Sequence, residues 1–450
     1  MAMTLIDSLA TTDQLAKVFS DNSVLRAALD FEVALARVEA RLGIISESAA
    51  NVIAETGSTE KFDIAVLTRD MRGSATFGVP FVKMLTERIR SRDRESAKFV
   101  HWGATSQDVA DTTLILLLKK SKPVLLGDIG RLERALEKLA EEHASTVMLG
   151  RTLMQAAPPI TFGLKAAGWL AAIRRCQVRL EQALSEALVL QFGGATGTLA
   201  ALQERGIEVG KALAKELELG YPDAPWHTHR DRLGALVCAC GVLTASLGKV
   251  ARDIVLLSQN EVAELSEPSG SGRGGSSTMP HKQNPVGSVL ALAAANRVPA
   301  LVASYLSAMV QEHERAAGGW QSEWSTVADV IQATGSAVAA VAEAAEGLKV
   351  DVKRMQQNIA ATNGLIFAER AMMLLGSALG REEAHKLIQD ATRRSVSEGK
   401  SLVEVLREIP EITNTLDSDT LASLDDPRGY LGVAEEFRKR LLAGKDGPKT

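Results

Sequence analysis

An apolar repeat in the middle of the chain constrains its fold most. Apolar residues recur at steps of three and four from Leu233 to Leu257, and no proline interrupts residues 226–267. Such steps place these side chains on one face of an α-helix. The pattern predicts a helix of about eight turns, roughly 45 Å long at 1.5 Å per residue, which favours a bundle of long helices.

Three glycines lie within the same stretch. Gly234, Gly241 and Gly248 are spaced by seven residues, which lines one strip of the predicted helix with hydrogen atoms only. A glycine inside a helix costs about 1 kcal/mol relative to alanine. Three glycines in register therefore predict that another helix approaches this one closely.

The remaining sequence also favours helices. Further helical segments are expected at 24–42, 106–120, 129–143, 160–190, 285–311, 322–349, 367–379, 381–398, 401–407 and 421–425. Residues 56–97 break the periodic pattern, so Gly73, Gly78 and Pro80 are expected in loops. Aromatic residues make up only 4% of the chain, whereas strands prefer aromatic and β-branched side chains. The sequence therefore predicts an all-α protein.

Composition argues against a nucleic-acid-binding, secreted or membrane protein. The 450 residues carry 51 Lys and Arg against 55 Asp and Glu, a balance that argues against binding to nucleic acid. The three cysteines, an odd number, fit a reducing compartment rather than a disulfide framework. The amino terminus lacks the features of a signal peptide, and the longest uncharged stretches, 187–203 and 233–248, are shorter than the about 20 residues of a membrane span. A cytoplasmic protein without a membrane partner is expected.

The most unusual segment is the glycine-rich stretch 270–285. Gly270, Gly272 and Gly275 formally satisfy G-x-G-x-x-G, but a long helix precedes them, whereas a dinucleotide fingerprint follows a strand. Backbone N–H groups of such a loop can converge on an anion, and Lys282 and Asn284 add a cation and an amide. A plain surface linker is the alternative, and the lysine, the asparagine and two prolines after the glycines argue against it.

Residues 275–285 match every fixed position of G-S-S-x-M-P-x-K-x-N-P, the signature of the fumarase/aspartase superfamily. The resemblance implies a homotetramer of mostly helical, three-domain subunits, with domains expected at 1–110, 111–355 and 356–450. Its members make and break bonds β to a carboxylate through an aci-carboxylate intermediate. The resemblance assigns the general base to Ser276, and it assigns binding of the substrate carboxylate to Lys282 and Asn284.

Residues 101–112 resemble the first motif of this superfamily. There, the hydroxyls of a Thr-Ser pair at a helix start hold a carboxylate, which carries over to Thr105 and Ser106. The physical argument agrees, because such a pair offers hydroxyls and free N–H groups to an anion. A simple helix N-cap is the alternative at these two positions.

Residues 150–163 resemble the second motif, Gly-Arg-Thr-His-x-Gln, with one departure: Leu153 replaces the histidine. An amine leaving group needs protonation, and a general acid contributes typically about 10²–10⁴-fold. A carboxylate leaving group needs no such acid. Adenylosuccinate lyases also carry a His-Asp pair upstream of the first motif, where this chain has Ala-Thr-Phe-Gly-Val at 75–79.

Together with residues 311–324, these features resemble one branch of the superfamily, whose members cyclise an unsaturated tricarboxylate to a lactone without a metal or organic cofactor. Each site is expected to draw on three subunits. The residues expected to be catalytic are Ser276, Lys282 and Asn284. Those expected to bind the small tricarboxylate are His101, Thr105, Ser106, Thr152, Gln155, Ser277, His281 and Arg315.

Several alternatives stay open at this stage. Arg315 could form a helix-surface ion pair, and Arg151 is expected to be structural. His227 and His229 lack a credible third metal ligand, and core packing is favoured for the tryptophans of residues 311–324. For the whole chain, the rivals are an amine-eliminating lyase, such as an adenylosuccinate lyase, and a catalytically silent structural paralogue.

Overall fold

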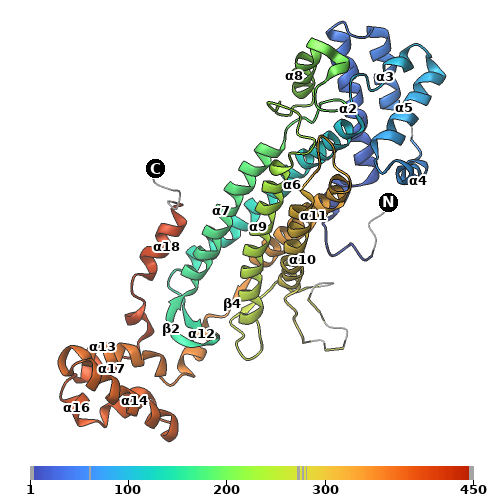
Figure 1. Ribbon diagram of the computed structural model, residues 1–450. Helices are drawn as coiled ribbons and strands as arrows, with labels where there is room; N and C mark the ends of the chain where they lie inside the picture. The colour runs from blue at the N-terminus through green and yellow to red at the C-terminus, as the bar shows by residue number, and fades with distance from the viewer. Residues whose placement is uncertain (1–4, 60–61, 271–273, 276–277, 280, 445–450) are drawn as a thin grey trace. The chain divides into compact units, whose positions relative to one another are not determined.

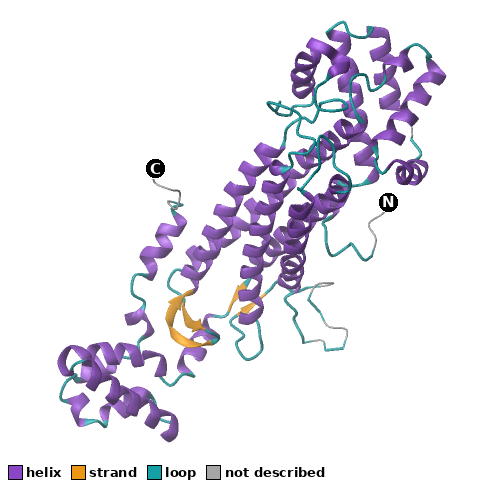
Figure 2. Cartoon of the chain, viewed as in Figure 1, coloured by secondary structure: helices purple, strands orange, loops and turns teal. Residues whose placement is uncertain are grey.

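The structure is a computed structural model that describes residues 5–59, 62–270, 274–275, 278–279 and 281–444 (Figure 1). The chain divides into two compact units, each built from three stretches. Unit 1 comprises Met1–Gly130, Arg175–Gly248 and Leu290–Ala340, and unit 2 comprises Arg131–Arg174, Lys249–Val289 and Val341–Thr450. Helices dominate both units, as predicted (Figure 2). The division into three domains stays a prediction.

Unit 1 contains shorter helices from two parts of the chain, residues 13–99 and 200–216. These are α1 (Asp13–Val18), α2 (Asp21–Arg41), α3 (Glu47–Thr59), α4 (Ile64–Ser74), α5 (Gly78–Arg92), η1 (Ser96–Phe99), η2 (Ala200–Arg205) and α8 (Gly206–Glu216). Helix α2 confirms the predicted segment 24–42. It begins where the Ser20 hydroxyl accepts from the backbone N–H of Ser23, and it packs against α3 and α8.

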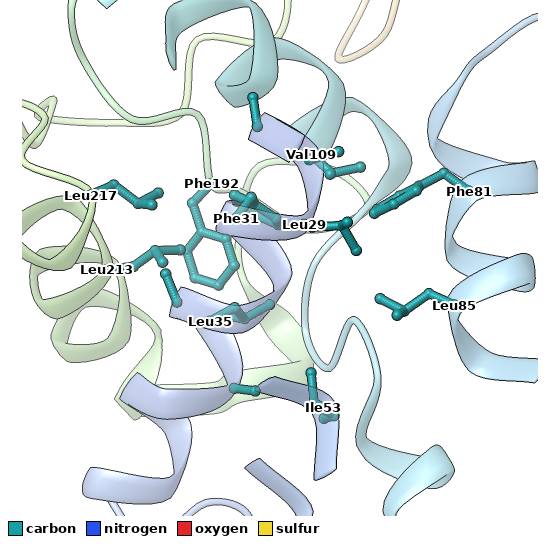
Figure 3. Packing of buried hydrophobic residues seen from close by; sticks show 14 of the residues in the cluster. Leu29, Phe31, Leu35, Ile53, Phe81, Leu85, Val109, Phe192, Leu213 and Leu217 are labelled. Atoms are coloured by element: carbon teal, nitrogen blue, oxygen red, sulfur yellow. The ribbon is translucent and has the colours of Figure 1, made fainter. Parts of the chain in front are cut away.

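The core of these helices is apolar and closely packed. Figure 3 shows Phe31 and Leu35 of α2 between Phe81 of α5 and Leu213 of α8. All four side chains are at most 1% exposed. Burial of each contributes roughly 1.5–3 kcal/mol, so α2 is fixed in its unit by its apolar face.

The expectation of loops at 56–97 is wrong in part. Gly73 lies within α4, and Gly78 and Pro80 lie in the first turn of α5. Proline is tolerated there because the first helical N–H groups have no partner within the helix. Gly78 permits a close approach, since a β-carbon at this position would lie 2.6 Å from the backbone oxygen of Ser106.

The boundary between the units passes through long helices that belong in part to each. These are α6 (Ser106–Glu142), α7 (Phe162–Ala187), α9 (Asp231–Leu257), α10 (Val286–Ala308) and α11 (Gly319–Glu346). Helix α9 confirms the central prediction. Helix α6 joins two segments that were predicted separately, and Pro123 lies inside it. The Pro123 side chain is exposed, so its ring faces solvent rather than a packed neighbour.

The three spaced glycines of α9 confirm the predicted close helix approach. Within unit 1, α9 and α10 lie side by side (Figure 1). A β-carbon at Gly234 would lie 2.8 Å from the sulfur of Met309, and one at Gly248 would lie 2.6 Å from the β-carbon of Ala295. A side chain at Gly248 would meet a β-carbon that cannot rotate away, and one at Gly234 would force the Met309 side chain to move, so the glycines serve packing within the chain.

Three helices, α9, α10 and α11, are long and apolar enough to cross a membrane by length and composition alone. The uncharged stretch 233–248 in α9 ends at Lys249, so it is shorter than a membrane span although the whole helix is long enough. The most apolar window is 56% buried in α9 and 72% in α11, but only 22% in α10. Much of the apolar surface of α10 is therefore uncovered in a single chain.

Unit 2 carries a β-hairpin that the sequence analysis did not predict, formed by β1 (Val147–Thr152) and β2 (Gln155–Thr161). A second antiparallel pair joins β3 (Leu265–Ser266) and β4 (Lys349–Val350). The carboxy-terminal helices are α12 (Val352–Ala360), η3 (Leu365–Phe367), α13 (Ala368–Leu379), α14 (Arg381–Glu398), α15 (Leu402–Arg407), α16 (Pro410–Thr413), α17 (Ser418–Ala422), η4 (Pro427–Tyr430) and α18 (Ala434–Leu442). Their buried residues form a separate apolar core.

Candidate active site

The first motif lies at the start of α6, in unit 1, where Asp108 fixes the backbone. The carboxylate of Asp108 accepts hydrogen bonds from the backbone N–H groups of Thr105, Gly193 and Gly194, at 2.9–3.0 Å. It also contacts His227 Nε2 at 2.8 Å. One buried acid thus ties two distant loops to the turn that presents Thr105 and Ser106.

Arg315 lies against the same turn. Its guanidinium donates to the hydroxyl of Thr105 at 2.7 Å and to the hydroxyl of Ser106 at 3.3 Å. The structure therefore brings these three predicted residues together. A guanidinium beside two hydroxyls offers several donors to one anion, the arrangement that a carboxylate prefers. Arg315 forms no ion pair among the described residues.

The segment that carries Arg315 rests on a buried ionic cluster. Arg230 contacts Asp111 at 2.8 Å and Glu323 at 2.6 Å, and all three side chains are fully buried. Gln311 donates to Glu323 at 2.6 Å, and Trp320 donates to Asp111 at 2.8 Å. The cluster therefore holds both ends of residues 311–320.

Ionisation within this cluster follows from burial and pairing. Burial raises the pKa of Glu323, and the charge of Arg230 only partly offsets that effect. Burial acts on Asp111 in the same direction, but there Arg230 prevails and lowers the pKa. Removal of the Arg230 cation would leave two carboxyl groups in an apolar environment, which is costly unless they take up protons.

His101 lies in the turn before Thr105, and its backbone has a φ of +60°. Its Nδ1 contacts Oε1 of Glu32, on α2, at 2.6 Å. The side chain of His101 is 12% exposed and that of Glu32 is 1% exposed. The buried carboxylate of Glu32 therefore holds His101. In the sequence, His101 precedes Thr105 and Ser106 by four and five residues.

The signature loop belongs to unit 2, and two of its predicted residues, Ser276 and Ser277, lie outside the described residues. His281, Lys282 and Asn284 line a cavity of about 990 Å³. Gly274 has a φ of +72°, and its carbonyl accepts from the backbone N–H of Asn284 at 2.8 Å. The glycine thus closes the base of the loop, while the side chain of Lys282 is exposed.

The junction between this loop and α10 is fixed by Glu267, which is 6% exposed. Its carboxylate accepts from the backbone N–H groups of Gly287 and Ser288, both at 2.8 Å. These N–H groups belong to the first turn of α10, where a negative charge is favourable. Glu267 also lines the cavity, so one acid anchors the loop and shapes the space beside Lys282.

The second motif forms the turn of the β1–β2 hairpin. Thr152 pairs with Gln155, and the intervening Leu153 and Met154 have φ values of +49° and +68°. Positive φ at two successive residues other than glycine is uncommon and strained. Leu153 is 97% exposed and Met154 is 70% exposed. The turn thus presents an apolar tip that its own unit does not cover.

Arg151, next to this turn, has a structural contact. Its guanidinium contacts both oxygens of Glu264, at 2.7 and 3.0 Å, and Glu264 is fully buried. Asn358 of α12 donates to the same carboxylate at 2.8 Å. The pair fixes the hairpin within unit 2, in line with the structural role expected for Arg151.

The position of the upstream His-Asp pair of adenylosuccinate lyases holds a packed aromatic residue. Phe77 is 5% exposed. Its ring stacks on Phe81 with centroids 5.1 Å apart, and it lies 5.9 Å from the ring of Trp324. No proton donor is present at this position. Trp320 is 7% exposed, so core packing is confirmed for that residue.

Sequence reasoning missed six acids with an evident role: Glu32, Asp108, Asp111, Glu264, Glu267 and Glu323. Asp108 follows Thr105 by three residues, a spacing typical of helix starts that could have identified it. Glu32 and Glu264 lie 69 and 113 residues from their partners, and no local pattern signals them. Within the described residues, no group of three His, Cys, Asp or Glu side chains could hold a metal ion.

The chain matches known protein families, curated relatives and solved structures over most of its length. A family model described as Lyase matches residues 8–300, and one described as adenylosuccinate lyase C-terminus matches residues 364–441. The chain is 45% identical to the 3-carboxy-cis,cis-muconate cycloisomerase of Bradyrhizobium diazoefficiens, with 94% of each chain covered. It is 44% identical to the Pseudomonas aeruginosa protein of that name, with 95% of this chain and 93% of the relative covered. It is also similar to the crystal structure of 3-carboxy-cis,cis-muconate lactonizing enzyme from Pseudomonas putida, with a TM-score of 0.92, 40% identity and 98% of each chain covered.

Proposed function

The chain belongs to the lyase family whose model matches residues 8–300, and from that premise we propose that it lactonises 3-carboxy-cis,cis-muconate to 4-carboxymuconolactone. This reaction is a step in the breakdown of protocatechuate. The observation that carries the proposal is 44–45% identity to two relatives named for this substrate, over at least 93% of each chain.

In the proposed reaction, one carboxylate oxygen of the substrate attacks the alkene carbon β to a second carboxylate. A C–O bond forms, and the π electrons move into that second carboxylate to give an aci-carboxylate. Ser276 then delivers a proton to the α-carbon, which completes the lactone, and the serine alkoxide takes up a proton from water. The reverse reaction is a β-elimination with a carboxylate leaving group, so no separate acid is needed for that group.

The described residues support separate roles for the two clusters. Lys282 and Asn284 line the same cavity, and a cation with an amide donor there would stabilise the charge that develops on the aci-carboxylate. In a site shared between copies, Arg315 with Thr105 and Ser106 of another copy would bind another carboxylate of the substrate. The substrate carries three carboxylates, so a second cluster of donors is required in addition to the loop.

Two positions count against an amine-eliminating lyase. Leu153 replaces the histidine of the second motif, and Phe77 is packed between Phe81 and Trp324 where adenylosuccinate lyases carry a His-Asp pair. Without these proton donors, an amine leaving group would depart as an unfavourable anion. The cyclisation, which expels no amine, is unaffected by both replacements.

An ultraviolet assay tests the proposed reaction. The purified protein is mixed with freshly generated 3-carboxy-cis,cis-muconate, and loss of the conjugated diene is followed. We expect rapid loss that depends on the enzyme, and no fumarate when adenylosuccinate replaces the substrate. Fumarate release without diene loss would instead identify an amine-eliminating lyase.

We also propose a homotetramer with sites shared between subunits, in the cytoplasm. The exposed Leu153–Met154 tip supports this, because Thr152 and Gln155 beside it form no side-chain hydrogen bond among the described residues. The free thiols of the three cysteines fit a reducing location. A second copy that covers the tip would bring the second motif to a substrate.

The outer stripe of α10, defined by exposed small residues at steps of three and four, is the proposed contact between copies. Its members in unit 1 are Ala293, Asn296, Ala300, Ala303 and Ser307. Small side chains at such steps allow another helix to approach closely. Much of the apolar surface of α10 is uncovered in one chain, which also supports a partner there.

Substitution in the outer stripe tests the assembly. Ala300→Glu introduces a charge into the proposed contact, so we expect the tetramer to dissociate and turnover to fall at least about tenfold. Light scattering after size exclusion gives the mass. Ala422→Glu, at another exposed helical alanine on α17, is the matched control and is expected to remain tetrameric. A fully active Ala300→Glu monomer would exclude shared sites.

A further inference from the structure

The contact between Glu32 and His101 is a buried acid–base pair that the catalytic assignments leave unexplained. Glu32 lies on α2, 69 residues before His101, and reaches Nδ1 at 2.6 Å. It is surrounded by the apolar cluster that contains Phe31 and Leu35. A carboxylate in such an environment is costly unless a cation or strong donor faces it. The pair is therefore stable only if His101 carries a proton on Nδ1.

The ring of His101 is held in one orientation. Glu32 occupies Nδ1, and the ring also hydrogen-bonds to the backbone of Thr105, which places the imidazole against the turn that carries Thr105 and Ser106. The backbone of His101 adopts a φ of +60°, which is uncommon for a residue other than glycine and concentrates at functional sites. Thr105 and Ser106, which follow His101 by four and five residues, form the anion-binding group together with Arg315.

Charges on two elements face His101. Burial alone would lower its pKa, but the negative charge of Glu32, from α2, together with its hydrogen bond outweighs burial, and Asp108, from α6, acts in the same direction. The result is a raised pKa. Asp108 is already shared among three backbone N–H groups and His227, whereas Glu32 makes its described hydrogen bond to His101.

A second acid on α2 offers a natural comparison. Glu39 lies seven residues after Glu32, is fully buried, and neither of its carboxyl oxygens has a hydrogen-bond partner in the described part of the chain. Burial, with a smaller contribution from the charge of Glu32, raises the pKa of Glu39 to about 9. At neutral pH the Glu39 carboxyl is therefore uncharged, and unlike Glu32 it has no hydrogen-bond partner among the described residues.

We propose that Glu32 is a positioning residue that presents His101 as an imidazolium beside Thr105, where its positive charge attracts a carboxylate of the substrate. The inference rests on the proposed function only for the identity of that substrate. Orientation and charge of His101 are properties of the free protein, since Glu32 and His101 belong to the same unit.

Glu32→Gln is the direct test, because an amide oxygen can still accept from Nδ1 while the negative charge is lost. We expect the pKa of His101 to fall below its ordinary value, as the cost of burial is no longer offset. NMR of histidine labelled with ¹³C at the ε1 carbon gives this pKa, and His101→Gln assigns the signal. This measurement needs no substrate, so it does not depend on the proposed reaction.

Kinetics supplies the second readout. On the alkaline side of neutrality we expect Glu32→Gln to raise KM at least about tenfold with little change in kcat, because the cation beside the substrate carboxylate is lost. KM should return toward the wild-type value as the pH falls below the new pKa of His101. A merely structural role of Glu32 would not produce recovery at lower pH.

Glu39→Gln is the matched control, since it makes the same change on the same helix at a carboxyl that is already neutral. It is expected to leave both the pKa of His101 and the KM profile unchanged at neutral pH. Should Glu32→Gln fail to assemble, Glu32→Asp keeps the charge on a shorter side chain, and a raised pKa of His101 with a raised KM is expected.

Two results would overturn the inference. An unchanged pKa of His101 in Glu32→Gln would show that Glu32 does not set its charge. A lowered pKa with an unchanged KM would show that the imidazolium does not bind the substrate. A protein that fails to convert 3-carboxy-cis,cis-muconate but shows the expected NMR shift would contradict the proposed function alone.

Discussion

Ser276→Ala is expected to lower kcat by about 10²–10⁴-fold while the protein remains tetrameric. The variant removes the hydroxyl proposed to transfer the proton at the α-carbon. Lys282 and Asn284, which are proposed to stabilise the intermediate, are retained. KM should change much less than kcat, because a proton in flight is a feature of the transition state rather than of the bound substrate.

Diene loss at saturating substrate measures this effect, and size exclusion with light scattering verifies assembly. Ser271→Ala is the matched control, because it removes a hydroxyl from the same glycine-rich stretch without a proposed role in proton transfer. It is expected to keep kcat within about twofold of wild type. Near-normal turnover by Ser276→Ala would show that another group donates the proton.

Arg230→Met is expected to destabilise the protein by about 3–5 kcal/mol, the cost of leaving buried charges without their partner. Asp111 and Glu323 are fully buried and depend on this guanidinium. The loss should also loosen residues 311–320 and therefore weaken the contact of Arg315 with Thr105 and Ser106. Turnover is expected to fall even at temperatures where the variant stays folded.

The midpoint of urea denaturation, at fixed protein concentration, measures the change. Arg440→Met is the matched control: it breaks the Arg440–Glu436 pair at 2.8 Å, whose side chains are 67% and 55% exposed. An exposed pair contributes little because water screens it, so this midpoint should hardly move. Equal shifts in the two variants would contradict the structural role assigned to the Arg230 cluster.

Much of the fold could be predicted because apolar residues recur at steps of three and four along a long amphipathic helix. Helix α9 is one case, and its three glycines even indicated the close neighbour. Helix α5 was missed because Gly78 and Pro80 read as loop residues, although the first turn of a helix tolerates both. The β1–β2 hairpin was missed because its turn uses Leu153 and Met154 in place of glycine or asparagine.

The candidate site shows a similar division. Motifs identify residues whose neighbours are close in sequence, such as Thr105 with Ser106, or Lys282 with Asn284. Their supports come from elsewhere: Glu32 reaches His101, and Arg315 reaches Thr105 across 210 residues. Such partners depend on packing between helices, which a single sequence does not reveal. Roles for Ser276 and Ser277 stay predictions, since both lie outside the described residues.

The glycine contacts of α9 have a mechanical consequence for α10. At Gly234, Gly241 and Gly248 no side chain of α9 lies between the helices, so Met309, Val302 and Ala295 contact the α9 backbone directly. The distance between α9 and α10 is fixed most closely at Gly248, where the facing atom is the β-carbon of Ala295. The outer stripe lies on this same helix, so the contacts with α9 also determine the position of the outer stripe. In the proposed tetramer, the position of the surface that contacts another copy would therefore depend on the α9 backbone at Gly248, and a side chain added at Gly248 would displace that surface.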